Sequence, residues 1–320
     1  MTSSAVLRRA VIPVLLAVVV LGASASAVAR PVRAALVDAG RPHPSSGTGP
    51  DLRSVFTATS DGAPLHVSFW FPTPGPGAAP VLVWVHGGGW IAGSDVDRPA
   101  DLRRYAQEGW LVMSVEYELA RPGRPTWDLA GPQVACALGR LAAEAAPLGG
   151  DVRRLVLAGA SAGGQLAVSV GYRAATGTQD SSCGLPVPVP SAVVAEYPAL
   201  DPVDGYERGV PRADSRAFKR AYTGGTPAEV PERYRAVTGV DALSRDAPPT
   251  LLVEGGADRL VPRAGLDRFV VAARALGVPV DHVVVPGADH AFDAVDGSPG
   301  QRAGHVLLSE WARERVALPL

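Results

Sequence analysis

The chain has 320 residues, of which 47% are hydrophobic and 19% are charged. This length and composition are sufficient for one large α/β domain, or two smaller domains, with a sizeable core. The 30 basic and 31 acidic residues leave a formal net charge of −1, and the basic residues are scattered along the chain. This balance argues against binding to nucleic acid and indicates no attraction to an anionic membrane surface.

Residues 1–29 have the composition of an export signal. Arg8 and Arg9 precede the apolar run AVIPVLLAVVVL, and the small-residue stretch GASASAVA follows it. This order predicts a cleaved signal peptide and a secreted protein. The alternative is an uncleaved N-terminal anchor, because Ala10 to Ala29 carries no charge. Such an anchor would hold the protein on the outer face of the cytoplasmic membrane, and membrane contact is expected only in that case.

The remaining chain is predicted to be a linker followed by one domain. Residues 30–50 are rich in Pro, Gly and Ser and predict the linker. The domain, residues 51–320, begins with two strand-like runs, SVFTAT and LHVSFWF, which flank the turn SDGAP and predict a β-hairpin. The polar, turn-rich segment 201–248 is predicted to form a lid or a wall of the substrate site.

Strands and helices then alternate to the C-terminus. Strands that are apolar throughout are typical of a parallel sheet with helices on both faces, and the hairpin is expected at an antiparallel edge. In such sheets, functional residues gather at the C-terminal ends of the strands. The expected strands are 81–86, 110–117, 154–160, 191–200, 249–256 and 280–287, and the expected helices are 98–109, 132–146, 163–176, 265–277 and 304–317.

Ser161 is the candidate nucleophile. It lies in GASAG, between the strand RLVLAG and a predicted helix. A turn this tight exposes the hydroxyl and leaves no room for large side chains two residues away, which explains Gly159 and Gly163. It also places the Ala162 N–H at a helix N-terminus, where it can hold a developing oxyanion. An ordinary turn is the alternative, since G-x-S-x-G also occurs by chance.

The motif HGGGW, residues 86–90, ends the strand VLVWV. Three consecutive glycines allow backbone N–H groups to approach a negative oxygen closely, so Gly87 and Gly88 are predicted to complete an oxyanion hole with Ala162. The alternative is a flexible loop. His86 is predicted to be a structural residue that fixes this loop.

A serine nucleophile requires a base and an acid that orients the base. Of the six histidines, His290 follows the strand VDHVVVPG at the expected edge of the sheet. Asp258 follows the strand in LLVEGGADRLVP and is the predicted acid, with Glu254 and Asp289 as alternatives. The remaining histidines are predicted to be surface or packing residues: His43, His66, His282 and His305, besides His86.

The motifs HGGGW, GASAGG, DRLVP and DHAF resemble those of α/β-hydrolase carboxylesterases near the hormone-sensitive-lipase-like and feruloyl-esterase-like groups. The similarity extends over about residues 52–316. It implies the α/β-hydrolase fold, a mostly parallel eight-stranded twisted sheet with helices on both faces. It also implies Ser161 as nucleophile, His290 as base, Asp258 as acid, and no metal or organic cofactor.

The chain departs from the lipase-like pattern at three points. Ala160 stands where these relatives commonly have aspartate before the nucleophile. Glu118 replaces the arginine of their Y-R-L-A-P-E motif. The stretch before HGGGW leaves little room for an N-terminal helical cap. These departures favour an open site for small or carbohydrate-linked esters over long lipid chains.

Cys136 and Cys183 are the two cysteines of the chain. In an exported protein they could form one disulfide, and their spacing neither requires nor excludes it. The alternative is a pair of buried thiols.

Together these observations predict an exported serine carboxylesterase that hydrolyses small or short-chain esters through an acyl-enzyme on Ser161. The expected partner is a small-molecule ester. An acyltransferase or a serine peptidase would use the same triad. A non-catalytic binding module on a hydrolase fold is a further alternative, although such modules usually lose a triad member.

Overall fold

The computed structural model of the protein describes residues 47–73, 77–208 and 215–316. The predicted signal peptide or anchor, residues 1–29, lies outside these ranges, together with most of the predicted linker. Within the described ranges, no helix has the length and apolar character needed to cross a membrane.

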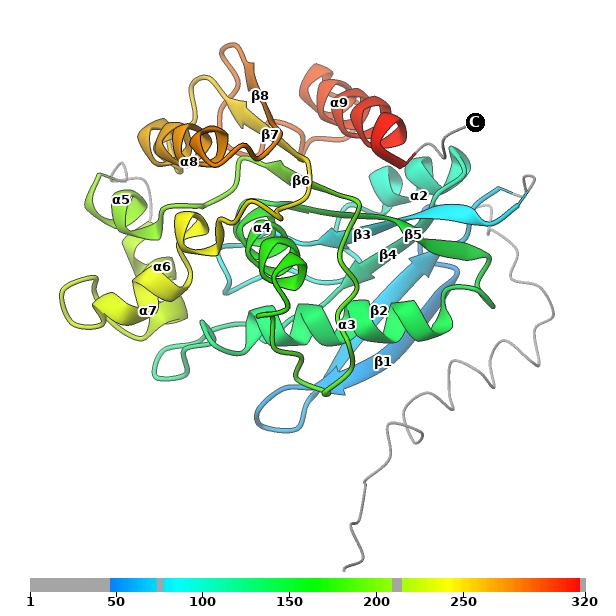
Figure 1. Ribbon diagram of the computed structural model, residues 1–320, viewed down its shortest axis with the longest axis horizontal. Helices are drawn as coiled ribbons and strands as arrows, with labels where there is room; N and C mark the ends of the chain where they lie inside the picture. Colours follow the sequence, from blue (N-terminus) through cyan, green and yellow to red (C-terminus); the bar gives the residue numbers. More distant parts are fainter. Residues whose placement is uncertain (1–46, 74–76, 209–214, 317–320) are drawn as a thin grey trace, which may run out of the picture.

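Eight strands form one twisted sheet in the order β1-β2-β4-β3-β5-β6-β7-β8 (Figure 1). β1 and β2 form an antiparallel hairpin and β2 pairs antiparallel with β4, whereas the other neighbouring strands are parallel. The predicted sheet is therefore confirmed. The strands are β1 Leu52–Ala58, β2 Pro64–Trp70, β3 Ala79–Val85, β4 Leu111–Val115, β5 Gly150–Ala160, β6 Ala192–Glu196, β7 Thr250–Gly255 and β8 Val280–Val285.

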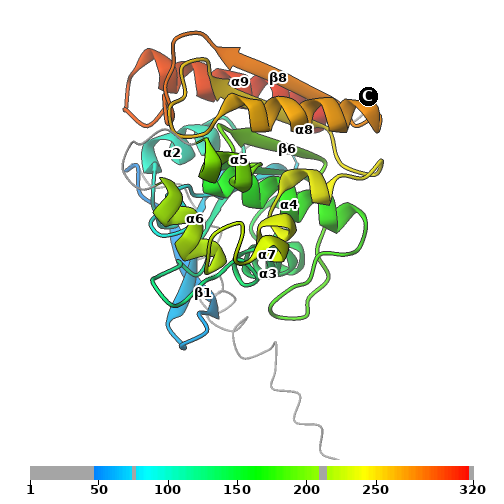
Figure 2. The same ribbon diagram turned by 90° about the vertical axis from the view of Figure 1, so that its left-hand side faces the viewer.

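Helices cover both faces of the sheet. One face is covered by α2 (Pro99–Gln107) and α9 (Pro299–Val316), and the other by α3 (Ala130–Glu144), α4 (Ala162–Ala175) and α8 (Arg263–Ala275). The segment predicted as a lid or wall lies beside β6 and α4 (Figure 2). It contains α5 (Pro202–Glu207), α6 (Ser215–Thr223), α7 (Pro231–Ala236) and the 3₁₀ turn η1 (Gly239–Ala242).

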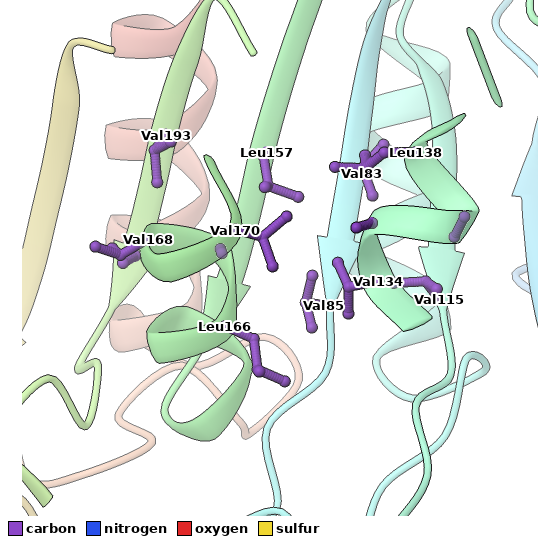
Figure 3. Close-up of a cluster of buried hydrophobic side chains, with 14 of the residues drawn as sticks. Val83, Val85, Val115, Val134, Leu138, Leu157, Leu166, Val168, Val170 and Val193 are labelled. Carbon is purple, nitrogen blue, oxygen red and sulfur yellow. The ribbon is translucent and has the colours of Figure 1, made fainter. Parts of the chain in front are cut away.

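The alternation of side chains along each strand builds two hydrophobic cores. In β3, Val83 and Val85 lie in the core under α3 and α4, whereas Leu82 and Trp84 lie in the core under α2 and α9. Figure 3 shows the first core, where branched side chains of α3 and α4 face those of the central strands. Strands apolar throughout are required because the sheet is buried on both sides.

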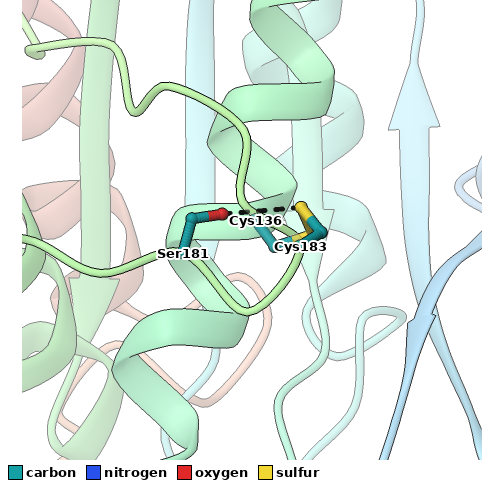
Figure 4. Close-up of a disulfide and its surroundings, with 3 residues drawn as sticks. All are labelled: Cys136, Ser181 and Cys183. Atoms are coloured by element: carbon teal, nitrogen blue, oxygen red, sulfur yellow. Dashed lines mark hydrogen bonds between the residues drawn. A yellow bond between two sulfur atoms is a disulfide. The ribbon is translucent and has the colours of Figure 1, made fainter. Parts of the chain in front are cut away.

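Cys136 and Cys183 are joined in a disulfide, with their Cα atoms 5.5 Å apart (Figure 4). The bond connects the buried middle of α3 to the loop that follows α4. A cross-link over a separation of 47 residues stabilises the fold by about 4 kcal/mol, because it reduces the entropy of the unfolded chain. The structure therefore contains the disulfide and not the alternative pair of buried thiols.

The glutamate that departs from the lipase-like pattern has a local structural role. Glu118 is buried, and its carboxylate accepts hydrogen bonds of 2.6 Å from both the N–H and the hydroxyl of Ser60. Its own N–H donates to Oε1 of Gln133 at 2.8 Å. Glu118 therefore ties the turn of the β1–β2 hairpin to the segment after β4 and to α3.

Candidate active site

Ser161 stands alone between β5, which ends at Ala160, and α4, which begins at Ala162. Its backbone has φ 55° and ψ −116°, a conformation that residues other than glycine rarely adopt. The surrounding chain holds it there, because the Ser161 N–H donates to the Glu196 carbonyl at 2.8 Å and the Ser161 carbonyl accepts from the Gln165 N–H at 3.0 Å. This is the strained strand-to-helix turn that the sequence predicts.

The glycines on either side of the turn are required by space, as predicted. A Cβ atom on Gly159 would lie 2.5 Å from the carbonyl oxygen of Gly163. One on Gly163 would lie 2.1 Å from the carbonyl oxygen of Val85 and 2.3 Å from that of His86. The start of α4 thus lies directly against the end of β3 and the beginning of the HGGGW loop.

The structure brings Ser161, His290 and Asp258 together in one hydrogen-bonded chain. Nε2 of His290 is 3.0 Å from Oγ of Ser161, and Nδ1 of His290 is 2.8 Å from Oδ2 of Asp258. The other carboxylate oxygen of Asp258 accepts the N–H groups of Leu260 and Val261 at 2.8 and 2.9 Å. Because these bonds fix the carboxylate, it can hold the imidazole in one orientation and tautomer.

The two alternative acids face elsewhere. Both carboxylate oxygens of Asp289 accept hydrogen bonds from Arg259, which keep the pKa of Asp289 well below its ordinary value. Oε1 of Glu254 lies 3.0 Å from Nε2 of His282. Among the three candidate acids, Asp258 is therefore the one hydrogen-bonded to the imidazole of His290, whereas Asp289 accepts the backbone N–H of His290 at 2.9 Å.

Glu254, Asp267 and His282 lie close enough to share a metal ion, with candidate ligand atoms within 4.8 Å of one another. The Nε of Arg263 lies 3.3 Å from Glu254 and 3.4 Å from Asp267. This guanidinium already supplies the positive charge between the two carboxylates, so we assign no metal to the group.

Gly87, Gly88 and Ala162, the predicted oxyanion donors, lie around Ser161. A Cβ atom on Gly87 would be 3.5 Å from that of Ser161, and one on Gly88, at φ 103°, would be 2.1 Å from the carbonyl oxygen of Ala92. Ala162 is the first residue of α4, so its N–H has no carbonyl partner within the helix. Gly87 and Ala162 therefore lie directly beside Ser161, and Gly88 lines the same pocket, where the sequence predicts the oxyanion donors.

His86 is part of the support of this loop. Its Nδ1 lies 2.8 Å from the Gly87 carbonyl oxygen, and its ring stacks on Tyr117 with centroids 4.3 Å apart. The hydroxyl of Tyr117 donates to the carbonyl of His86 at 3.1 Å. Burial lowers the pKa of His86, so a neutral ring donates from Nδ1 to the backbone and fixes the loop. These contacts confirm the predicted structural role.

A pocket of about 470 Å³ opens at Ser161. Its walls are mostly apolar, and Phe218 of α6 brings the predicted wall segment to the site, lying against Gly89. The sequence carried no signal that would single out these wall residues, because their contact depends on how separate loops meet. Besides the residues already named, the lining includes Trp84, Ile91, Ala92, Asp97, Arg98, Tyr197, Leu260 and Ala291.

The serine on the turn after β5 is hydrogen-bonded to a histidine beyond β8, and this histidine is hydrogen-bonded to an aspartate beyond β7. On a mostly parallel sheet this is the arrangement typical of serine hydrolases of the α/β-hydrolase fold. The BD-FAE family model matches residues 68–269, more than half of the chain. The chain therefore belongs to the BD-FAE family, among the α/β-hydrolase carboxylesterases.

Individual relatives agree with this assignment. Esterase LipC of Mycobacterium tuberculosis is 31% identical over 74% of this chain and 60% of its own length. The crystal structure of esterase LipW from Mycobacterium marinum superposes with a TM-score of 0.62 at 26% identity, over 83% of this chain and 82% of that one. Esterase 2 of Thermogutta terrifontis, at 23% identity, shares the fold with a TM-score of 0.67 over 85% of this chain and 94% of its own. The chain spans 60% of the length of LipC and 52% of that of the M. tuberculosis esterase LipQ.

Proposed function

We propose that the protein is a serine carboxylesterase that hydrolyses small or short-chain carboxylic esters through an acyl-enzyme on Ser161. The observation that carries this proposal is the continuous hydrogen-bonded chain from Ser161 through His290 to Asp258, at 3.0 and 2.8 Å. The esterase names of the relatives LipC and LipW support the class of reaction.

The geometry suits a two-stage acyl transfer. Nε2 of His290 takes the proton of Ser161 as Oγ bonds to the ester carbonyl carbon, and Asp258 stabilises the imidazolium. The N–H groups of Gly87, Gly88 and Ala162 hold the oxyanion, and each such donor lowers the barrier by about 3 kcal/mol. His290 then returns its proton to the departing alkoxide. In the second stage His290 takes a proton from water, whose oxygen bonds to the acyl carbon, and then gives that proton to Oγ of Ser161 as the carboxylic acid leaves.

The pocket supports a preference for short acyl chains. Phe218 forms part of the pocket wall beside Gly89, and within the described residues 47–73 the chain before β3 forms a β-hairpin. Export is supported by the signal-like residues 1–29 and by the disulfide, since such bonds persist in oxidising compartments. We therefore propose that the enzyme acts outside the cytoplasm.

A series of p-nitrophenyl esters from acetate to decanoate tests the reaction and the chain-length preference. We expect kcat/KM to be highest for the shortest chains, because longer chains meet the part of the wall that Phe218 forms. The variant Ser161→Ala should be inactive on every ester. A maximum at decanoate would reject the short-chain preference, and equal rates for Ser161→Ala and wild type would reject the mechanism. Adding methanol separates hydrolysis from acyl transfer, because a transferase would form the methyl ester preferentially.

A further inference from the structure

A buried charged cluster lies behind the loop that carries His290. We define it as Arg98, Glu196, Tyr197 and Asp293. Nη1 of Arg98 lies 2.5 Å from Asp293 and 3.1 Å from Glu196, and the hydroxyl of Tyr197 donates to Oδ1 of Asp293 at 2.6 Å. The cluster joins the N-terminus of α2, the end of β6 and the segment after β8.

The charges of the cluster are paired through Arg98, whose Nη2 also lies 2.7 Å from Oδ2 of the buried Asp101. Burial and the nearby charge of Asp293 raise the pKa of Glu196 well above its ordinary value. Burial by itself would lower the pKa of Arg98, but the charges of Glu196 and Asp293 outweigh it and raise that pKa. Asp293 thus accepts a hydrogen bond from the hydroxyl of Tyr197 and forms an ion pair with Arg98, which also donates to Oε2 of Glu196 at 3.1 Å. These two contacts restrain the position of the buried carboxylate.

Tyr197 connects the cluster to the catalytic histidine. Its ring meets the His290 imidazole edge to face, with centroids 4.7 Å apart and planes at 65°. Its hydroxyl donates a hydrogen bond to Asp293, which lies three residues after His290 in the same loop as the histidine. Its N–H donates to the Val253 carbonyl at 2.6 Å, which fixes Tyr197 to the sheet. Tyr197 therefore contacts the ring of His290 directly and also holds the loop of His290 in place.

The backbone around the histidine requires such support. Tyr197 has φ 37° and Ala291, directly after His290, has φ 55°. These left-handed conformations are unfavourable for residues with a side chain, and they persist only where surrounding contacts impose them. A purely structural cluster would explain the ion pairs with Arg98, but it would not require an aromatic ring against the imidazole.

We propose that Tyr197 is a positioning residue for His290. The proposal rests on the proposed serine-esterase function. The ring edge limits rotation of the imidazole, and the hydroxyl bond to Asp293 fixes the loop, so that Nε2 stays within hydrogen-bond distance of Ser161. Tyr197 lines the pocket, and the proposed effect of its ring and hydroxyl is on proton transfer, through His290.

The variants Tyr197→Phe and Tyr197→Leu test this role, with Tyr172→Phe as the matched control. Tyr172 is also buried, and its hydroxyl lies 2.8 Å from that of Thr250. On p-nitrophenyl acetate we expect Tyr197→Phe, which keeps the ring edge, to lower kcat about 10-fold, and Tyr197→Leu to lower it about 100-fold. KM should change by less than about 2-fold in both variants, because only the transition state depends on the alignment. Tyr172→Phe should keep the wild-type kcat.

Thermal unfolding of the three variants separates positioning from stability. Tyr197→Phe and Tyr172→Phe each lose one buried hydroxyl bond, so we expect similar losses of stability, but a fall in kcat for Tyr197→Phe alone. Equal kcat values for these two variants, in a reaction that Ser161→Ala abolishes, would overturn the positioning role. Full activity of Ser161→Ala would reject the proposed function instead, and the positioning role with it.

Discussion

Replacing His290 by alanine is expected to lower kcat for p-nitrophenyl acetate about 10⁴-fold. Without the imidazole, no side chain of the described residues is left in hydrogen-bond contact with Oγ to take the proton of Ser161 or return it to the leaving group. The oxyanion donors of the HGGGW loop would remain and would leave a small residual rate. Purified variant and wild type are compared by steady-state kinetics, and their thermal unfolding is expected to be similar, because the imidazole is at the surface of the pocket.

His66→Ala is a suitable control for this variant. His66 also contacts a carboxylate, with Nδ1 3.0 Å from Glu116, but it lies in β2 and does not line the pocket. We expect its kcat to stay within about 2-fold of wild type, as for other substitutions that leave the reacting atoms in place. A kcat for His290→Ala within 10-fold of wild type would contradict its role as the base.

Replacing Gly163 by alanine has the largest expected effect on stability. The new methyl group would lie 2.1 and 2.3 Å from the carbonyl oxygens of Val85 and His86. Both are backbone atoms, so α4 or the end of β3 must move. We expect the free energy of unfolding to fall by about 3 kcal/mol. kcat should fall as well, because the same movement separates the Gly87 N–H from Ser161. Denaturant unfolding and kinetics on p-nitrophenyl acetate measure the two effects.

Gly131→Ala provides the comparison for a glycine in a neighbouring helix. A Cβ atom on Gly131 in α3 would have its nearest neighbours 3.9 Å away, at Gln179 and Val170. We expect this variant to be unchanged or up to about 1 kcal/mol more stable, since alanine favours the helix. If Gly163→Ala were as stable and active as Gly131→Ala, the close contact between α4 and β3 would be refuted.

The parts of the fold and site that the sequence predicts are those that depend on local pattern. Apolar strands bounded by turns placed Ser161, Asp258 and His290 each after a strand, and parallel strands bring such positions to one edge of the sheet. Gly159 and Gly163 were predictable because a strand-to-helix turn with a serine at its tip has no space for side chains. The order of these segments therefore predicted which residues meet.

Other features depend on contacts between segments far apart in the chain. Arg98 precedes α2, Tyr197 follows β6 and Asp293 lies after β8. No local sequence pattern predicts that Arg98, whose backbone is in the left-handed region, pairs with the buried carboxylates of Glu196 and Asp293. Phe218 reaches the pocket only because α6 packs over the HGGGW loop, where Tyr222 stacks on Trp90 at 4.5 Å. Side-chain packing of this kind follows from the assembled fold.

The central claim, that Ser161 is the nucleophile, is tested most directly by covalent labelling. The full chain is treated with a fluorophosphonate, which reacts with an activated serine, and the site of the adduct is determined by peptide mass spectrometry. We predict one adduct per chain, on Ser161, with loss of esterase activity in proportion to labelling and no adduct on Ser161→Ala. An adduct on a different residue, or complete inactivation of the enzyme without modification of Ser161, would contradict the proposed mechanism.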